Sequence, residues 1–480
     1  MASMFEPMTS SEAAPGLRTL FARQRQAASS PEVSASVRID RLRRATDLLV
    51  AHQSELCIAL AHDFGQRPAA LTRSMDILPA VLSLNYARRH VRRWMRPQNV
   101  TIGWPFGFPG TRARICYQPL GVVGIISPWN FPITLTFGPL AGVLAAGNRC
   151  LIKPSEHTPA LAELLQRLVS VTFDATEVAV ITGGSDVAAA FSCLPFDHLL
   201  FTGSTAVGRR VCTAAAANFV PVTLELGGKC PVVLGGTADL SQAVNHILLA
   251  KLANAGQMCV APDHVYLPAG CIDAFVALAK RWVADAYPPG RLSADATAII
   301  NEQQLQRAQA LLSDAAARGA QLIPLTSSSG DTGARLMVPT LVVGATDSMR
   351  LMQEEIFAPI LPLLGYEHVG QVIEQLAPAR PLALYYFGTD RREQRRLLAH
   401  TRSGGVCING VATQFLIEAL PFGGIGASGI GAYHGVHGFQ RFSHARSIVH
   451  QSRLDIGRWL GLRPPYGSRL ERVLAFLLGR

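Results

Sequence analysis

One cysteine of the chain stands where a thiol could act as a nucleophile. Cys259 lies in the stretch NAGQMCVAPDH (254–264), and after Val260 it is followed by the Ala261-Pro262 pair, beyond which a regular helix cannot continue. A thiol beside a helix terminus or an exposed turn can have a lowered pKa and attack an electrophile. An inert buried cysteine is the alternative, and it is the commoner role of the residue type. The stretch by itself leaves both interpretations open.

A second candidate is a carboxylate inside an apolar run. Glu225 lies in TLELGGKCP, between two leucines and just before two glycines. Burial at this position would raise the pKa of its carboxyl and suit a general base. A structural acid that accepts hydrogen bonds from the backbone of the glycine turn is the alternative.

Two further motifs stand where open α/β sheets bind ligands. CLIKPSEHTP places Lys153 at the end of an apolar strand and Glu156 one turn later, a pair that could hold two ribose hydroxyls or form a solvated ion pair. In HLLFTGSTAVGRRVC, Gly203 and Gly208 bracket a turn into a helix whose N–H groups could face a phosphate. This turn lacks the lysine of a P-loop and the three-glycine dinucleotide fingerprint, so an ordinary strand–turn–helix junction fits it as well.

The elements that must position these residues predict an α/β protein. Residues 15 to 97 have the apolar spacing of helices, and a Pro/Gly-rich passage at 96–114 is expected to be irregular and to end in a strand. Beyond it, short apolar runs such as GVVGIIS and VAVITG alternate with helical segments such as LTFGPLAGVLAAGN. This alternation predicts a doubly wound parallel sheet, with a second α/β unit after about residue 225.

Composition excludes several classes of protein. The 480-residue chain has no apolar run near 18 residues, so a transmembrane helix is not expected. Its net charge of +11 rests on arginines dispersed along the chain, which argues against nucleic-acid binding. Nine cysteines without a CxxC pair disfavour a zinc site or a disulfide framework, so no metal is expected. The N-terminus lacks the apolar core of a signal peptide, and we therefore expect a cytoplasmic protein.

Seven motifs occur in order along the chain. They are PWNFP (128–132), KPSE (153–156), FTGSTAVG (201–208), LELGGK (224–229), GQMC (256–259), EEIFAP (354–359) and PFGGIGASGIGAYHG (421–435). Together they resemble the aldehyde dehydrogenase superfamily, over roughly residues 18 to 478. The ending GAYHGVHGFQRFSHARSIVHQ resembles its class 3 branch, and LPFDHLLFTGSTAVGR resembles the coniferyl aldehyde dehydrogenases within that branch.

The resemblance implies a catalytic set of three residues. Cys259 would attack an aldehyde carbonyl to give a thiohemiacetal, and loss of hydride would leave a thioester. The side-chain amide of Asn130 and the backbone N–H of Cys259 would stabilise the oxyanion. Glu225 would activate the water that releases a carboxylic acid. An aromatic, coniferyl-type aldehyde is the expected substrate; a fatty or long-chain aldehyde is the alternative, and a non-catalytic binding protein of the same fold is the alternative from another class.

The same resemblance implies a nicotinamide cofactor. The residues that would hold it are Trp129, Lys153, Glu156, Gly203, Ser204, Gly208, Glu355 and Phe357. A 2′-phosphate would meet the negative charge of Glu156, so NAD is the expected cofactor. NADP stays open as a second cofactor, because class 3 enzymes often accept both.

The implied fold has two doubly wound parallel-sheet domains and an oligomerisation hairpin. The expected divisions are an NAD-binding domain (1–97 and 119–224), a catalytic domain (225–420) and oligomerisation or bridging segments (98–118 and 421–480). We expect a homodimer in which the C-terminal segment pairs with the partner subunit. The tail WLGLRPPYGSRLERVLAFLLGR has an apolar face between arginines; packing on the protein's own or a partner's surface is favoured over peripheral membrane contact.

Three positions depart from the family pattern. Met258 stands beside the predicted nucleophile, where the family usually has threonine or a similar small polar residue. Cys230 replaces a common serine and Ala358 replaces a glycine. Since none of the three is a predicted catalytic residue, activity is expected to survive.

Overall fold

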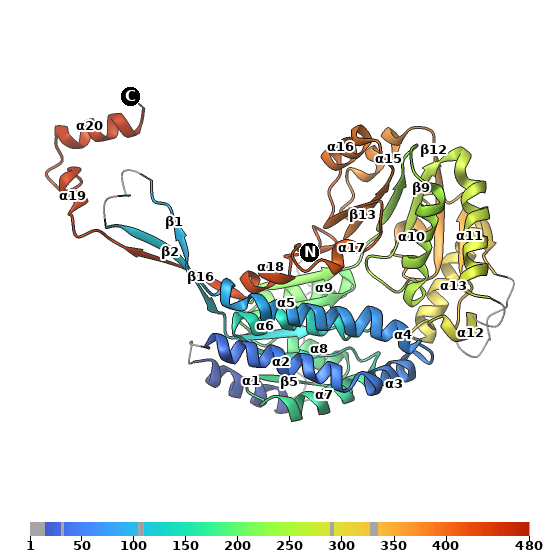
Figure 1. Ribbon diagram of the computed structural model, residues 1–480, viewed down its shortest axis with the longest axis horizontal. Coiled ribbons are helices and arrows are strands. Elements are labelled where there is room, and N and C mark those ends of the chain that lie inside the picture. The colour runs from blue at the N-terminus through green and yellow to red at the C-terminus, as the bar shows by residue number, and fades with distance from the viewer. Residues whose placement is uncertain are drawn as a thin grey trace, which may run out of the picture.

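The computed structural model describes residues 15–29, 33–103, 107, 110–288, 292–326 and 335–479. In Figure 1 the N-terminal helices and a first α/β layer form the lower part of the body, and a second α/β layer stands above them. A narrow arm projects from the body and carries the C-terminal helices at its far end.

The chain before the first sheet is helical. Its elements are α1 (Pro15–Ala28), α2 (Ala35–Ala51), α3 (Gln53–Phe64), α4 (Ala69–Thr72), the π-helical turn η1 (Arg73–Ile77) and α5 (Leu78–Trp94). The Ser34 side chain caps α2 by accepting a bond from the N–H of Val37, and Gly65 ends α3 at φ 77°. The apolar faces of α2, α3 and α5 share one core with α6 and α7. The helical spacing predicted for this region is confirmed for its described residues.

The first sheet has the strand order β15-β7-β6-β3-β4-β5. Its strands are β3 (Val122–Ile126), β4 (Arg149–Lys153), β5 (Val178–Val180), β6 (His198–Gly203), β7 (Val222–Leu226) and β15 (Gly429–Ile430), and its helices are α6 (Thr134–Ala146), α7 (Pro159–Thr172), α8 (Ser185–Ser192) and α9 (Thr205–Ala216). Only β15 pairs antiparallel, with β7. The chain runs outward from β3 through β4 to β5 and returns at β6, so the strand order reverses between β3 and β6. Ligands of such sheets bind beyond the carboxyl ends of the strands at this reversal.

The second sheet has the order β10-β11-β12-β9-β8-β13-β14. Its strands are β8 (Pro231–Leu234), β9 (His264–Pro268), β10 (Gln321–Pro324), β11 (Thr340–Val343), β12 (Ile360–Tyr366), β13 (Ala383–Phe387) and β14 (Gly405–Ile408). The helical elements of this part are α10 (Leu240–Leu252), η2 (Ala253–Gly256), η3 (Ala269–Cys271), α11 (Ile272–Ala286), α12 (Leu292–Asp295), α13 (Glu302–Ala317), α14 (Arg350–Gln353), α15 (Val369–Leu376), α16 (Arg391–His400) and α17 (Thr413–Leu416). Only β10 pairs antiparallel, with β11. The predicted α/β class, with a second unit after about residue 225, is confirmed.

The arm joins two segments that lie far apart in the sequence. β1 (Gln98–Val100), β2 (Arg112–Pro119) and β16 (Ser443–His450) form a three-stranded antiparallel sheet, in which β16 pairs with β2 of its own chain. Before β16, α18 (Gly435–Arg441) packs on α6; beyond it lie α19 (Ile456–Trp459) and α20 (Ser468–Leu477) (Figure 1). No described residue of α20 is fully buried, and Figure 1 shows this helix at the far end of the arm.

Two features are absent from the residues that the structure describes. Among these residues no helix combines the length and the apolar character that crossing a membrane requires. The same residues contain no cluster of three or more His, Cys, Asp or Glu side chains that could hold a metal ion. All nine cysteines carry free thiols.

Candidate active site

The loop that carries Cys259 has an unusual backbone. After α10, Asn254 and Ala255 adopt the left-handed region at φ 50° and 53°, and Gly256 follows at φ 73°. Left-handed conformations are costly for alanine, and such outliers persist where the surrounding structure imposes them. A Cβ on Gly256 would lie 2.5 Å from the carbonyl oxygen of Ala358, so the close approach of two loops requires glycine here.

Hydrogen bonds hold this loop on both sides of the cysteine. The buried Gln257 amide donates to the carbonyls of Asn254 (3.0 Å) and Ala298 (3.1 Å), and its oxygen accepts from the N–H of Ile300 (3.0 Å). The Cys230 thiol donates to the carbonyl of Cys259 itself (3.2 Å). Because the backbone is fixed in this way, the half-buried Cys259 side chain has a defined position.

The electrostatic environment of Cys259 corrects one expectation. Burial, followed by the charges of Glu355 and Glu225, raises the pKa of the Cys259 thiol to about 12. The interpretation of a low-pKa thiol at a helix terminus is therefore wrong for the protein without ligands, because burial and two carboxylates outweigh any favourable backbone dipole. A buried thiol near two carboxylates is predominantly protonated at neutral pH.

Glu225 has the buried position that its apolar neighbours predict. It lies on β7 opposite Gly429 of β15 and is 2% exposed, and neither carboxylate oxygen has a hydrogen-bond partner among the described residues. Burial raises the pKa of the Glu225 carboxyl well above its usual value, while the nearby charge of Arg441 lowers it. The alternative of a carboxylate satisfied by the glycine turn is not what the structure contains.

Asn130 joins the first sheet to the cysteine loop. It follows β3, and its side-chain Nδ2 donates to the carbonyl of Gln257 (3.1 Å), two residues before Cys259. Its own carbonyl accepts from Asn254 Nδ2 (3.0 Å) and from Arg67 (2.8 Å). The amide that the family resemblance assigns to an oxyanion is thus hydrogen-bonded directly to the loop of the predicted nucleophile.

The residues predicted for the adenosine end of a cofactor lie at the strand-order reversal. Lys153 ends β4, and its buried ammonium donates to Glu156 (3.1 Å), which remains 40% exposed. Ser204 follows β6 and caps α9 by accepting from the N–H of Val207 (3.4 Å). A Cβ on Gly208 would meet Leu226 at 2.6 Å, so this glycine lets α9 lie close to β7. An ion pair with an open carboxylate, beside a helix N-terminus, fits a dinucleotide at this edge.

Two residues predicted for the nicotinamide end, Glu355 and Phe357, lie on one loop between α14 and β12, and Trp129 contacts this loop from the chain after β3. The rings of Trp129 and Phe357 meet edge to face with centroids 5.5 Å apart, and Phe357 has φ 49°. Lys229 bonds to Asp263 and donates to the carbonyls of Leu351 (2.7 Å) and Glu354 (3.1 Å), which fixes the chain before Phe357.

Glu355 on the same loop is a half-buried carboxylate. Burial raises the pKa of Glu355 to about 7, even though the N–H of Gly228 bonds to it. A Cβ on Gly227 would lie 2.0 Å from a Glu355 oxygen, so the glycines after Glu225 allow this approach. The sequence motifs LELGGK and EEIFAP are therefore direct neighbours in space.

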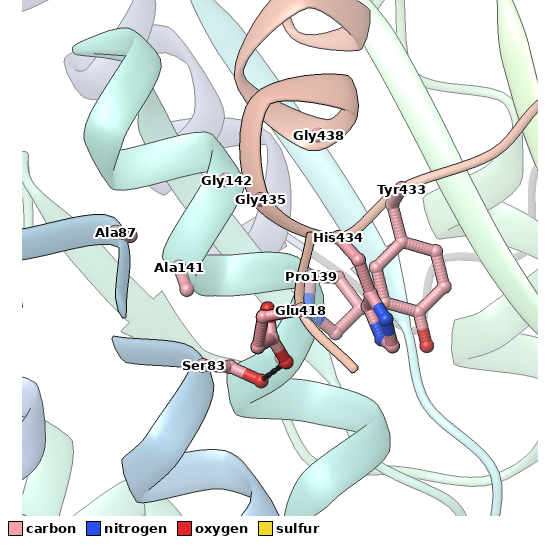
Figure 2. Close-up of a pocket in the computed structure, with 11 residues that line it drawn as sticks. Ser83, Ala87, Pro139, Ala141, Gly142, Glu418, Tyr433, His434, Gly435 and Gly438 are labelled. Atoms are coloured by element: carbon pink, nitrogen blue, oxygen red, sulfur yellow. Dashed lines mark hydrogen bonds between the residues drawn. The ribbon is translucent and has the colours of Figure 1, made fainter. Parts of the chain in front are cut away.

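A small cavity lies between α5, α6 and α18, with Tyr433 and His434 among its lining residues (Figure 2). At its edge the Ser83 hydroxyl bonds to the Glu418 carboxylate. The Tyr433 hydroxyl and His434 Nδ1 are buried without a protein partner among the described residues. The cavity measures about 10 Å³, which is room for about one water molecule and not for a substrate.

Several contacts of the site were missed by the sequence reasoning. Gln257 and Asn254 lie within the NAGQMC stretch, where two buried amides beside a glycine could have signalled a fixed loop. Arg67 lies 63 residues before Asn130, and no local motif marks it. Of the departures from the family pattern, Met258 belongs to the core of the second sheet, and Cys230 bonds to the Cys259 carbonyl rather than only filling space.

Comparison with known proteins agrees with the fold. The aldehyde dehydrogenase family matches residues 19–448, and the chain therefore belongs to this family of enzymes. It is 47% identical to a probable coniferyl aldehyde dehydrogenase of Caulobacter vibrioides, over 92% of each chain. It is 45% identical to a coniferyl aldehyde dehydrogenase of a Pseudomonas species, again over 92% of each. The substrate-bound structure of Staphylococcus aureus AldH matches with a TM-score of 0.89 and 34% identity, over 96% of this chain and 99% of that one.

Proposed function

We propose that this aldehyde dehydrogenase converts an aromatic, coniferyl-type aldehyde to its carboxylic acid through Cys259. Aldehyde, water and NAD(P)⁺ are consumed, and the acid, NAD(P)H and a proton are formed. The observation that carries the proposal is the hydrogen bond between the Asn130 amide and the Gln257 carbonyl, which brings the loop after β3 to the loop of Cys259. The charge of Glu225 also raises the pKa of the Cys259 thiol, which supports a position of Glu225 close to Cys259.

Each residue has a step that its surroundings support. The Cys259 thiol passes its proton to water, which is the proton that the overall reaction releases, and Sγ then bonds to the carbonyl carbon. The carbonyl oxygen takes up the π electrons and becomes an oxyanion that receives the free N–H of the Asn130 amide and the N–H of Cys259. A bound nicotinamide would supply the acceptor for the hydride that the thiohemiacetal loses. Glu225 then takes a proton from water, whose oxygen attacks the thioester carbon while the thiolate leaves. Burial without hydrogen-bond partners raises the pKa of the Glu225 carboxyl, which makes its carboxylate a stronger base.

The cofactor would lie along the carboxyl edge of the first sheet. Lys153 and Glu156 would hold the adenosine ribose, and Ser204, with Gly203 and Gly208 around it, would face the phosphates. At the other end, Glu355 would hold the nicotinamide ribose, and Phe357 with Trp129 would hold its ring. The open carboxylate of Glu156 favours NAD over NADP, because a 2′-phosphate would face a negative charge.

The proposal also covers the oligomeric state and the division into domains. We propose a homodimer formed through the arm, an NAD-binding domain of residues 1–97 and 119–224, a catalytic domain of 225–420, and bridging segments at 98–118 and 421–480. The names of the two bacterial relatives support the coniferyl-type substrate. A long-chain aliphatic aldehyde is the alternative substrate.

A steady-state panel tests the proposal. Coniferyl aldehyde, benzaldehyde and short and long aliphatic aldehydes are compared by kcat/KM with NAD and NADP, following NADH or NADPH. Cys259→Ala should abolish turnover, while Cys193→Ala, at an exposed thiol, should leave it unchanged. Turnover that survives Cys259→Ala would refute the mechanism. No turnover of any aldehyde by the wild type would favour a non-catalytic binding protein, and the highest kcat/KM on the long-chain aldehydes would favour the fatty-aldehyde alternative.

A further inference from the structure

A fully buried ion pair lies behind the loop of Asn130. Arg67, in the connection between α3 and α4, and Asp76, in the π-helical turn η1, approach to 3.2 Å with both side chains 0% exposed. Buried charges are expensive to desolvate, and π-helical turns often occur near functional sites, so their purpose has to be found in what they contact. Neither residue belongs to a motif of the predicted catalytic or cofactor set.

Arg67 contacts the backbone of Asn130 directly. Its guanidinium donates to the Asn130 carbonyl (2.8 Å) and lies over the rings of Phe64 (4.8 Å) and Phe131 (5.1 Å). Asn254 donates to the same carbonyl, so both lone pairs of that oxygen are used. The planar guanidinium of Arg67 therefore bonds to the Asp76 carboxylate and the Asn130 carbonyl at once while it lies over two rings. Lysine cannot reproduce this geometry.

Asp76 holds the chain three and four residues further on. Its Oδ1 accepts from the N–H groups of Ile133 (3.0 Å) and Thr134 (2.7 Å), at the first turn of α6. These N–H groups have no partner within the helix, so a carboxylate from another segment satisfies them. The Arg67–Asp76 pair therefore fixes both ends of the segment 130–134.

We propose that Arg67 and Asp76 are positioning residues that keep the Asn130 amide in register with the Cys259 loop. The inference rests on the proposed function, in which this amide stabilises the oxyanion. One hydrogen of Asn130 Nδ2 is fixed on the Gln257 carbonyl at 3.1 Å, and the second is the donor for the oxyanion. Any shift of the Asn130 backbone moves this second hydrogen relative to the sulfur, without removing either catalytic group. Arg67 and Asp76 themselves contact neither substrate nor cofactor.

The test compares reactions that do and do not form an oxyanion. Arg67→Met, Arg67→Lys and Asp76→Asn are made in the full chain and assayed for aldehyde oxidation and for hydrolysis of p-nitrophenyl acetate, an acyl transfer to Cys259 without hydride transfer. Both kcat values should fall about 10- to 100-fold for Arg67→Met and Asp76→Asn, short of the 10²–10³-fold loss expected for removing the donor itself in Asn130→Ala. Arg67→Lys, which keeps the charge, should recover part of the rate. Alkylation of Cys259 by iodoacetamide forms no oxyanion and should change less than about twofold.

A double variant and a matched control separate positioning from general damage. In an Asn130→Ala background, Arg67→Met should cause no further loss, because both act through one amide. Asp63 is the control: its buried carboxylate accepts from the N–H groups of Ala160 and Leu161 (both 2.9 Å) at the start of α7, and not from the segment 130–134. Asp63→Asn should lower the unfolding midpoint while kcat stays within about twofold.

Additive losses in the double variant would overturn the inference, as would unchanged ester hydrolysis or an alkylation rate that falls in step with activity. Should Arg67→Met fail to fold, Arg67→Lys and Asp76→Asn decide by the same criteria. If Asn130→Ala itself keeps wild-type rates, the oxyanion role in the proposed function is wrong and the inference fails with it. If only Asn130→Ala loses activity, the inference alone fails.

Discussion

Replacing Glu225 by glutamine should separate the stability of the protein from its activity. The wild-type carboxyl is 2% exposed and has no partner for either oxygen among the described residues, and burial raises its pKa well above the usual value. The amide side chain of the Glu225→Gln variant would keep the shape of the glutamate but could not ionise. The two proteins should therefore have similar stability below the pKa of the unfolded carboxyl and diverge as pH rises from there towards the pKa of the folded carboxyl.

The direction and the size of this pH dependence follow from the linkage between proton binding and folding. The unfolded carboxyl titrates near pH 4.3, and the folded one higher, so the stabilising preference for the protonated form is complete below the unfolded pKa and is lost as pH rises through the folded pKa. At a pH between the unfolded and the folded pKa of Glu225, the unfolded chain binds about one proton fewer than the folded chain. The free energy of unfolding of the wild type should then fall, relative to Glu225→Gln, by about 1.4 kcal/mol per pH unit. Above the folded pKa the gap should stay constant.

Urea-unfolding midpoints of both cofactor-free proteins between pH 5 and 9 measure this difference. The other titrating groups are common to both proteins and cancel in the comparison. The free energy of unfolding of Glu225→Gln should therefore increase relative to that of the wild type as pH rises. Its steady-state oxidation of aldehyde should fall by about 10²–10⁴, the usual contribution of a general base. A stability gap that does not change with pH would refute the buried, partnerless carboxyl; a gap that widens without loss of turnover would refute its role as the base.

Three shorter predictions concern the other parts of the site. Because the charge of Glu355 raises the pKa of the Cys259 thiol, Glu355→Gln should speed iodoacetamide alkylation of Cys259 severalfold at pH 8, measured by peptide mass spectrometry; an unchanged or slower rate would contradict the coupling. Gly256→Ala places a methyl 2.5 Å from the Ala358 carbonyl at φ 73° and should lower kcat at least tenfold, while a variant with normal kcat would show that the loop can shift freely. Glu156→Gln removes a charge beside a 2′-phosphate and should raise kcat/KM with NADP about tenfold relative to NAD; the wild-type ratio would place the carboxylate elsewhere.

The sequence could predict those features that depend on neighbouring residues. The apolar run GVVGIIS becomes β3 (Val122–Ile126), and LTFGPLAGVLAAGN becomes α6 (Thr134–Ala146), because both periodicities are local. The apolar neighbours of Glu225 likewise predicted its burial. Residues at the carboxyl ends of parallel strands, such as Lys153 and Ser204, could be expected at one edge once the sheet was expected.

Features that depend on distant segments could not be predicted. The stretch around Cys259 left open whether the pKa of its thiol is lowered, and burial, with Glu355 from a loop of the second sheet and Glu225 from the first, raises it. The Arg67–Asp76 pair reaches Asn130 only after the N-terminal helices fold against α6. Desolvation and charge are sums over everything that surrounds a group, and spacing along the chain contains little of that information.

The relation between donor and nucleophile is set at the boundary of the two sheets. Asn130 follows a strand of the first sheet and Cys259 precedes one of the second, and two hydrogen bonds cross between their loops, from Asn130 to Gln257 and from Asn254 to Asn130. Left-handed backbone at Asn254 and Ala255 costs of the order of 1–3 kcal/mol per residue, comparable with what two or three net hydrogen bonds contribute. The conformation that presents Cys259 therefore persists only while both sheets hold it. A change that loosens their contact should reduce acyl transfer before it unfolds either sheet.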